Sequence, residues 1–333
     1  MKREEMIAQI GDDSKEFDFV VIGGGATGIG IALEASARGY SVILLEKSDF
    51  TKSTSSKSTK LMHGGIRYLA QGDIGLVREA VVERGLMTQN APHLVKSQSF
   101  IIPTHGLYDE ILYTVGLTFY DLLAGKLSLG RSRRISKAKT LKRISTINPK
   151  KISAGVVYYD GQFDDTRMAI NTLQSASDLG AVILNYCNVT SMLKDDKGKL
   201  NGVAFTDEET GKKYEIKGKQ VVNATGVFAD DVLRMDSPGA EKTIAPSQGV
   251  HLVLDKSFLP DDDAITIPKT DDGRVLFLVP WHDKVIVGTT DTPIEKESLE
   301  PVALEEEVGF ILSTAERYLT KAPKRSDVLS VFA

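Results

Sequence analysis

The feature that most constrains the fold is a glycine-rich turn close to the start of the chain. Residues 17–22 are apolar and rich in β-branched side chains, which predicts a buried strand. Gly23, Gly25 and Gly28 follow at once in the spacing Gly-x-Gly-x-x-Gly, and a helical pattern then runs over 29–38. A strand, a glycine turn and a helix in this order predict the opening unit of an α/β fold.

The glycine spacing matches the fingerprint of dinucleotide-binding folds. In such a turn Gly23 allows a tight bend, Gly25 lets the backbone approach a pyrophosphate, and Gly28 lets helix and strand pack closely. A second strand is predicted over 41–45, and Glu46 at its end suits a carboxylate that bonds a ribose hydroxyl. We therefore predict a bound dinucleotide, with a tight turn that holds no ligand as the alternative. The fingerprint alone does not separate NAD from FAD.

Composition excludes several classes of protein. The chain of 333 residues exceeds the usual size of one domain, and its formal net charge of −4 argues against a surface devoted to nucleic acid. Cys187 is the single cysteine, which excludes an intramolecular disulfide and favours a reducing, cytoplasmic compartment. The five histidines have no metal-binding spacing, so we predict no metal, and no apolar stretch has the length of a membrane span.

Two more turns of small residues follow predicted strands later in the chain. Ala224, Thr225 and Gly226 follow one apolar strand, and Asp291 closes the turn 288–291 after another. Small residues at strand ends let the backbone approach a flat cofactor, although a plain tight turn is the alternative for each. Their distance in sequence from the first turn favours FAD, which lies across much of a chain.

The segment 55–68 resembles the flavin-contacting motif of FAD-dependent glycerol-3-phosphate dehydrogenases and oxidases. It reads Ser-Ser-Lys-Ser-Thr-Lys-Leu-Met-His-Gly-Gly-Ile-Arg-Tyr, and the resemblance extends over about residues 17–333. It implies a Rossmann-like FAD-binding domain interleaved with a mixed β-sheet substrate domain. We expect an N-terminal extension at 1–16, a discontinuous FAD-binding domain at 17–80, 150–230 and 285–333, and a substrate domain with cap at 81–149 and 231–284.

The resemblance also implies roles for single residues of this motif. Its hydroxyl, amide and cationic groups suit the phosphates, the ribityl chain and the ring system of FAD. The expected cofactor contacts are Ser55, Ser56, Ser58, Lys60, His63, Gly64 and Gly65. Arg67 offers a planar fork for a substrate phosphate and Tyr68 offers a hydroxyl. A solvated loop and a surface salt bridge are the alternatives.

His251 is the expected catalytic residue, because the resemblance puts it near the reactive face of the flavin. A neutral imidazole there would accept the hydroxyl proton of the substrate as hydride leaves the carbon. A histidine that is only part of a strand is the alternative. The implied reaction oxidises sn-glycerol 3-phosphate to dihydroxyacetone phosphate, with FAD as hydride acceptor and a quinone or oxygen as the final electron acceptor.

Three departures from the family pattern leave other functions open. Gly226 precedes Val-Phe where Pro-Trp is usual, and Gln248 replaces a usual lysine. The chain ends at Ala333, where the family pattern continues into motifs with two substrate-phosphate arginines and further FAD contacts. One alternative is therefore a non-catalytic or weakly FAD-binding fragment, and another is a related flavoprotein that oxidises a hydroxy acid or an amino acid.

A basic segment suggests a membrane partner. Residues 126–143 contain eight lysines or arginines and no acid, and they follow an apolar, aromatic segment at 111–129. This pattern suits the surface of an anionic bilayer, and a solvated loop after a core helix is the alternative. We expect peripheral attachment at the inner face of the cytoplasmic membrane, and no nucleic-acid partner.

Overall fold

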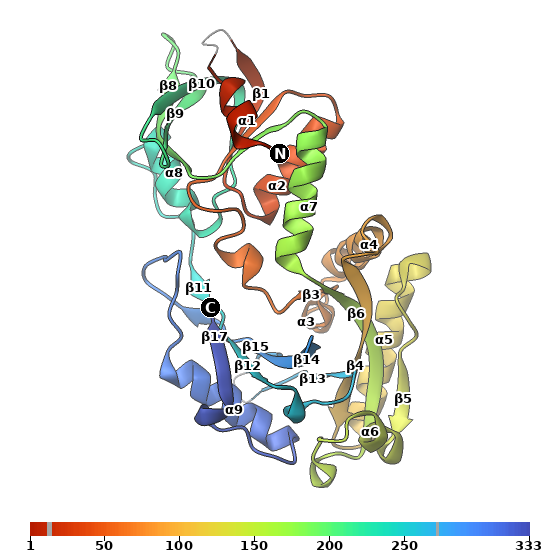
Figure 1. Cartoon of the computed structure of the whole chain (residues 1–333). Coiled ribbons are helices and arrows are strands. Elements are labelled where there is room, and N and C mark those ends of the chain that lie inside the picture. Colours follow the sequence, from red (N-terminus) through yellow and green to blue (C-terminus); the bar gives the residue numbers. More distant parts are fainter. Residues whose placement is uncertain (12–14, 271–272) are drawn as a thin grey trace. The chain divides into compact units, whose positions relative to one another are not determined.

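The computed structural model describes residues 1–11, 15–270 and 273–333, without the side chains of Arg67 and Ala70. These residues form two compact units, and each unit is built from three separate stretches of the chain (Figure 1). Unit 1 comprises Met1–Ser58, Asp165–Pro246 and Ile294–Leu299, and unit 2 comprises Thr59–Asp164, Ser247–Pro293 and Glu300–Ala333.

Unit 1 is built on a six-stranded sheet in the order β7-β2-β1-β10-β9-β8. The strands are β1 (Glu16–Ile22), β2 (Val42–Leu45), β7 (Val182–Leu184), β8 (Cys187–Lys194), β9 (Leu200–Asp207) and β10 (Lys213–Asn223). β1 pairs in parallel with β2 and β10, and β2 pairs in parallel with β7, whereas β9 is antiparallel to both β8 and β10. The predicted α/β class, with a strand–helix–strand start, is confirmed.

The helices of unit 1 cover this sheet. They are α1 (Arg3–Ala8), α2 (Ala26–Ala37), α7 (Asp165–Asp178) and α8 (Ala229–Asp236), with short 3₁₀ turns η1 (Thr54–Ser56) and η4 (Gly226–Phe228). α2 packs against α7 and against β1 and β2. All four residues of β2 are buried, as expected for a parallel strand that is covered on both faces. Met6 and Ile10 join the same core, so the predicted N-terminal extension packs on unit 1.

Unit 2 is built on a larger mixed sheet. The main path runs β17-β12-β15-β14-β13-β4-β6-β3, with β5 paired to β6, and β11 pairs separately with β16. Its strands are β3 (Leu61–Met62), β4 (Val95–Thr104), β5 (Arg133–Ser136), β6 (Ala154–Phe163), β11 (Ser247–Gln248), β12 (His251–Asp255), β13 (Ala264–Ile267), β14 (Leu276–Trp281), β15 (Lys284–Gly288), β16 (Thr292–Pro293) and β17 (Val328–Phe332). β4 and β6 form a ten-residue antiparallel ladder from Val95↔Phe163 to Thr104↔Ala154.

Helices also flank the sheet of unit 2. They are α3 (Ile66–Ala70), α4 (Ile74–Asn90), α5 (Leu107–Ala124), α6 (Lys137–Arg143) and α9 (Glu305–Tyr318), with η2 (Gly125–Leu127), η3 (Pro149–Lys151), η5 (Lys256–Phe258) and η6 (Arg325–Asp327). α4 and α5 pack together, and α9 packs against β15.

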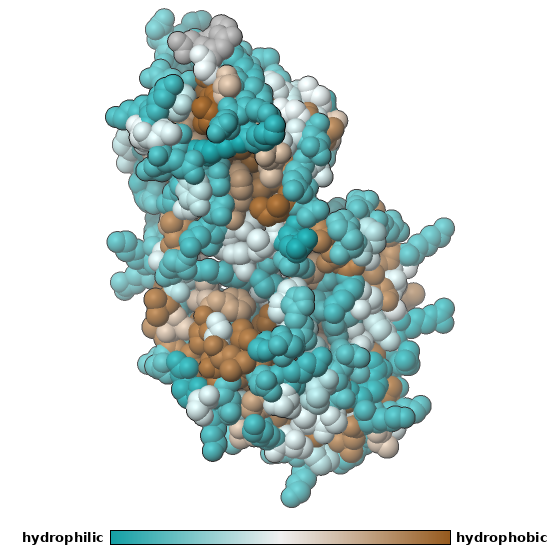
Figure 2. Space-filling model, in the orientation of Figure 1, coloured by the Kyte–Doolittle hydropathy of each residue, from teal (hydrophilic) through white to brown (hydrophobic). Residues whose placement is uncertain are grey.

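On the face seen in Figure 2 most of the surface is hydrophilic, with apolar patches between polar side chains. In the part of the chain that the structure describes, no helix is long and apolar enough to cross a bilayer.

The compact units divide the chain differently from the predicted domain ranges. Residues 59–80 and most of 285–333 belong to unit 2. The reason is strand pairing, because β3 pairs with β6, and β12 pairs with β15 on one side and with β17 on the other. Which stretches act as a FAD-binding domain and which as a substrate domain stays a prediction.

Candidate functional site

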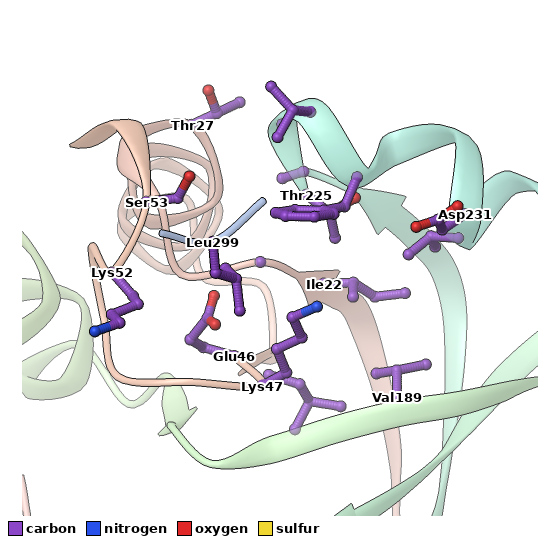
Figure 3. A pocket seen from close by; sticks show the side chains of 18 of the residues that line it. Ile22, Thr27, Glu46, Lys47, Lys52, Ser53, Val189, Thr225, Asp231 and Leu299 are labelled. Atoms are coloured by element: carbon purple, nitrogen blue, oxygen red, sulfur yellow. The ribbon is translucent and has the colours of Figure 1, made fainter. Parts of the chain in front are cut away.

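A pocket of about 660 Å³ lies in unit 1 at the carboxyl ends of β1, β2 and β10 (Figure 3). Open α/β sheets bind ligands at this edge, and the volume is in the range of small-molecule sites. Seven of the predicted cofactor residues line it: Gly23, Gly25, Glu46, Ser55, Ala224, Thr225 and Gly226. Residues from 22 to 299 thus contribute to one cavity.

Two glycines of the first turn are required by close backbone packing. A Cβ atom at Gly23 would lie 2.4 Å from the carbonyl oxygen of Ala224, and the φ angle of Gly23 is +113°. A Cβ atom at Gly28 would lie 2.0 Å from the carbonyl oxygen of Gly23. Gly28 does not line the pocket but lets α2 approach the end of β1, as the fingerprint predicts.

The N-terminus of α2 opens on the pocket. Gly25 is its N-cap and has no side chain to cap the first amides, and Ala26 and Thr27 line the cavity. Ser55 supplies one cap from another segment, because its hydroxyl oxygen accepts the amide of Ala26 at 2.8 Å. The positive end of the helix is therefore directed at the cavity, an arrangement that favours a bound phosphate.

Glu46 stands at the end of β2 and joins two loops. Its carboxylate accepts the amides of Gly24 and Ser48, each at 2.7 Å. Because a carboxylate has about four acceptor positions, two remain for a ligand hydroxyl. Lys47 was not predicted, yet it lines the pocket with its Nζ 4.5 Å from the ring centroid of Phe228. Its place two residues after the end of a parallel strand is the signal that would have identified it.

Two predicted serines of unit 1 do not line the pocket. The hydroxyl of Ser56 donates to the carbonyl of Ser53 at 3.3 Å. The hydroxyl of Ser58 donates to the carboxylate of Asp165 at 2.7 Å, and the Ser58 amide donates to the same oxygen at 3.3 Å. Ser58 therefore ties the loop to the first residue of α7.

The predicted residues Lys60, His63, Gly64 and Gly65 lie in unit 2. Lys60 has a φ of +61°, and its Nζ is 5.8 Å from the ring centroid of Phe332. His63 is exposed, and its Nδ1 accepts the amide of Gly65 at 3.1 Å. Gly65 has a φ of +72°, which favours glycine, so the turn before α3 is tightly determined.

The two predicted substrate residues lie on α3. Tyr68 is 39% exposed, and its amide donates to the carbonyl of Gly65 at 2.9 Å. The side chain of Arg67 lies outside the described part of the structure. The geometry of a phosphate-binding fork at α3 therefore stays a prediction.

His251 is buried at the start of β12, with 4% of its surface exposed. Its Nε2 lies 2.8 Å from the hydroxyl of Thr59, and its ring stacks on Phe332 with the centroids 4.8 Å apart. A Cβ atom at Gly288 would lie 2.3 Å from the imidazole ring, so this glycine makes room for it. The packing of His251 is that of a strand histidine, and its catalytic role stays a prediction.

The turn 288–291 is held by a buried carboxylate on α9. Glu307 accepts the hydroxyls of Thr290 at 3.0 Å and Thr292 at 2.6 Å, the side-chain amide of Gln248 at 2.7 Å and the amide of Leu304 at 2.9 Å. Burial alone would raise the pKa of Glu307, but these hydrogen bonds outweigh it and hold the pKa below its ordinary value. Asp291, the predicted contact in this turn, is exposed.

Unit 2 contains a buried ion pair that was not predicted from the sequence. Arg84 on α4 donates to Asp160 on β6 at 2.5 Å, and the hydroxyl of Tyr120 on α5 donates to the same carboxylate oxygen at 2.7 Å. Arg84 and Asp160 are each 2% exposed. The signal was an acid directly after the apolar run 154–159. Among the described residues no group of three or more His, Cys, Asp or Glu is arranged to hold a metal ion.

Comparison with known proteins identifies the family. The model of the FAD dependent oxidoreductase family matches residues 18–333, so the chain belongs to this family. This result confirms the prediction of FAD over NAD and the predicted fold class, a Rossmann-like unit with a mixed β-sheet.

Comparison with individual proteins gives a more specific resemblance than the family model does. The chain is 42% identical over 346 residues to the mitochondrial glycerol-3-phosphate dehydrogenase of Schizosaccharomyces pombe, with 99% of this chain and 53% of that protein covered. It is 38% identical over 335 residues to the mitochondrial glycerol-3-phosphate dehydrogenase of Homo sapiens, with 96% and 46% covered. The structure of a glycerol-3-phosphate dehydrogenase from Bacillus halodurans complexed with FAD is 31% identical with a TM-score of 0.80, over 99% of this chain and 58% of that one.

These matches confirm the predicted resemblance to glycerol-3-phosphate dehydrogenases. The chain spans about half the length of the curated relatives it matches. The activity, substrate and partners of a whole protein of this kind are therefore the subject of a proposal.

Proposed function

We propose that this protein binds FAD and oxidises sn-glycerol 3-phosphate to dihydroxyacetone phosphate, with electrons passing to a quinone or to oxygen. The observation that carries the proposal is the pocket of unit 1, in a chain 37–42% identical to glycerol-3-phosphate dehydrogenases. Bound FAD supplies the hydride acceptor, and the residues of the chain hold and orient it.

The pocket of unit 1 is suited to the adenosine diphosphate half of FAD. The open N-terminus of α2 and the hydroxyl of Ser55 supply donors for the pyrophosphate, and Gly25 allows the backbone to approach it. Glu46 has acceptor positions for the ribose hydroxyls. Thr225 and Gly226 give a small rim beside them.

The remaining predicted residues are assigned to the flavin and the substrate. Ser56, Ser58, Lys60, His63, Gly64, Gly65 and Asp291 are proposed contacts of the cofactor. Arg67 and Tyr68 are proposed to bind the substrate phosphate. His251 is proposed to take the substrate hydroxyl proton, which requires a substrate oxygen to replace Thr59 as the partner of Nε2.

Binding of FAD is tested by titrating the 333-residue chain with FAD and with NAD. We expect the visible absorption of a bound flavin and thermal stabilisation by FAD alone. Gly25→Ala fills the space where the pyrophosphate backbone contact is proposed, and should weaken FAD binding. Gly30→Ala on the same helix, where a Cβ atom meets nothing within 4 Å, is the matched control. Stabilisation by NAD alone contradicts the proposal.

The substrate is tested by anaerobic bleaching of the bound flavin. We expect bleaching with glycerol 3-phosphate and little with glycerol, because a phosphate dianion adds charge-assisted hydrogen bonds that glycerol lacks. A hydroxy acid and an amino acid complete the panel. Bleaching by either of these instead of glycerol 3-phosphate would assign the chain to the alternative substrate class. Flavin that binds and is bleached by none of them would support the non-catalytic alternative.

A peripheral contact with an anionic membrane is the second part of the proposal. An apolar stripe with heptad spacing runs along α5, formed by Tyr108, Leu112, Val115, Phe119 and Leu122. Val115 is 64% and Leu122 is 71% exposed. The basic segment 126–143 follows directly, and α5 packs against its strand β5. Exposed apolar side chains beside cations are suited to the interface of an anionic bilayer.

Sedimentation with vesicles tests this contact. We expect more protein to sediment with anionic phosphatidylserine vesicles than with neutral phosphatidylcholine vesicles. The double variant Val115→Gln/Leu122→Gln should lower the partition coefficient by roughly tenfold or more, because two aliphatic side chains no longer enter the bilayer. Val302→Gln, at an exposed apolar position of unit 2 that is not part of α5, is the control. Equal recovery of the wild-type chain in both supernatants contradicts the contact, and with it the predicted attachment at the inner face of the membrane.

A further inference from the structure

The buried network of Arg84, Asp160 and Tyr120 ends on the backbone of the turn before α3. The hydroxyl oxygen of Tyr120 accepts the amide of Gly64 at 2.7 Å while its proton is donated to Asp160. Arg84 donates to Asp160 at 2.5 Å and reaches the Tyr120 hydroxyl at 3.3 Å. A helix α4, a helix α5 and a strand β6 thus converge on one backbone amide.

The surroundings leave this amide little freedom. A Cβ atom at Gly64 would lie 2.2 Å from the side chain of Val81 and 2.5 Å from the hydroxyl oxygen of Tyr120. Tyr120 and Val81 are fully buried in one small apolar cluster. Burial, with the nearby Asp160 carboxylate, raises the pKa of Tyr120 well above its ordinary value, so the phenol keeps the proton that it donates.

Stability alone is a poor account of this arrangement. Burying an ion pair gains little over packing apolar residues of the same size, because desolvation offsets the attraction between the charges. What the pair does supply is a fixed direction for the Tyr120 hydroxyl, since its proton is held by a carboxylate that Arg84 in turn holds. The Gly64 amide is therefore bound to an acceptor whose orientation is set by Asp160.

We propose that Tyr120, oriented by Asp160 and Arg84, is a positioning residue that fixes the Gly64 amide and with it the turn 63–65. This inference rests on the proposed function, in which that turn contacts the flavin. Tyr120 itself lies behind the turn and acts through it. Its expected effect is on the geometry of the cofactor contact, and through α3 on the residues 67 and 68 that follow.

The test compares two buried tyrosines of unit 2 in the full chain. Tyr120→Phe removes the hydroxyl that holds Gly64, whereas Tyr158→Phe removes an equally buried hydroxyl that bonds Thr266 at 2.8 Å and does not touch the turn. Hydrogen exchange of the Gly64 amide is measured by NMR on glycine-labelled protein without FAD. We expect exchange to be about tenfold faster in Tyr120→Phe and unchanged in Tyr158→Phe.

FAD binding and stability give the second readout. We expect Tyr120→Phe to raise the Kd for FAD by roughly fivefold or more and to shift the visible spectrum of the bound flavin. Asp160→Asn keeps an acceptor for the Tyr120 proton but leaves Arg84 without its counter-charge. It should therefore destabilise unit 2 more than Tyr120→Phe does, and yet accelerate Gly64 exchange less.

Each outcome decides the inference. Equal exchange in the two tyrosine variants overturns it, and so does an exchange rate that simply follows the loss of stability across the three variants. Faster exchange of Gly64 in Tyr120→Phe with an unchanged FAD Kd and spectrum also overturns the claimed effect on the cofactor. If the wild-type chain binds no FAD, the proposed function fails, while the exchange rates still decide whether Tyr120 positions the turn.

Discussion

Replacing Glu307 by glutamine tests how strongly one buried carboxylate holds the turn 288–291. The carboxylate accepts four hydrogen bonds at 2.6–3.0 Å from Thr290, Thr292, Gln248 and Leu304. Glutamine offers a single oxygen, so either the Leu304 amide faces a second donor or the threonine hydroxyls must turn. Hydrogen bonds to a charged group contribute roughly 1.5–3 kcal/mol each, and some are regained by reorientation. We expect the free energy of unfolding of unit 2 to fall by about 2–3 kcal/mol at pH 7.

The lowered pKa of Glu307 also predicts how the effect of the Glu307→Gln substitution on stability changes with pH. The pKa of Glu307 in the folded chain is lower than its ordinary value of 4.5, so the folded state stabilises the ionised form. That stabilisation is complete above pH 4.5 and is lost as the pH falls through the folded pKa. The difference in unfolding free energy between wild type and Glu307→Gln should therefore be widest near neutral pH and shrink in acid.

The single tryptophan makes the assay specific for unit 2. Trp281 is the only tryptophan of the sequence and lies at the end of β14, so its fluorescence in urea follows the unfolding of this unit. Glu305→Gln on the same helix is the control. Glu305 is 78% exposed and pairs with Arg325, so its loss should cost under about 1 kcal/mol. Equal losses for the two variants, or a difference that stays constant down to pH 4, would refute the reasoning.

Three further predictions concern unit 1. In a thermal unfolding assay without FAD, Gly28→Ala should destabilise the chain by roughly 1–3 kcal/mol, because its Cβ atom would overlap a backbone oxygen. Gly30→Ala, the control in the same assay, should be neutral or slightly stabilising. Gly25→Ala should leave that stability within about 1 kcal/mol but lower FAD affinity in a titration. Burial raises the pKa of Cys187 from 9.0 to about 11, so its alkylation by iodoacetamide at pH 8, followed by mass spectrometry, should be about a hundredfold slower than that of a free thiol. Alkylation at the rate of a free thiol would contradict the burial.

The sequence predicted the elements whose signals are local. A β-branched run, a glycine turn and an alternation of helix and strand specify β1, α2 and β2 within 30 residues, and the structure follows them closely. The two longest partners in unit 2, β4 and β6, were not predicted. β4 has four polar residues at 96–99 and contains Pro103, and β6 contains two glycines and Asp160, so neither has the alternation of a half-buried strand. Their pairing joins residues up to 68 positions apart, which no local pattern encodes.

The site divides in the same way. Residues that belong to a recognisable sequence motif, such as Glu46 and Ser55, were identified from sequence and line the pocket. The support behind the turn 63–65 was not, because Arg84, Tyr120 and Asp160 belong to three elements with no shared motif. Only the ladder between β4 and β6, with α4 and α5 packed on it, brings these three side chains together.

Two glycines of the fingerprint, Gly23 and Gly25, differ in how strongly the fold itself constrains them. The backbone packs closely against Gly23 on both sides. Its amide donates to the carbonyl oxygen of Leu45 at 2.9 Å, and a Cβ atom would lie 2.4 Å from the carbonyl oxygen of Ala224. This contact exists because β10 runs parallel to β1 and ends beside it, so the fold needs glycine there whether or not a ligand is bound. Gly25 has φ −83° and ψ 177°, which any residue adopts, and the nearest atom to its Cβ would be the Ser55 hydroxyl at 3.2 Å. The described fold therefore constrains position 25 less than position 23, with one tight contact to a side chain and none to the backbone. This difference supports the proposal that a pyrophosphate approaches the N-terminus of α2 at Gly25.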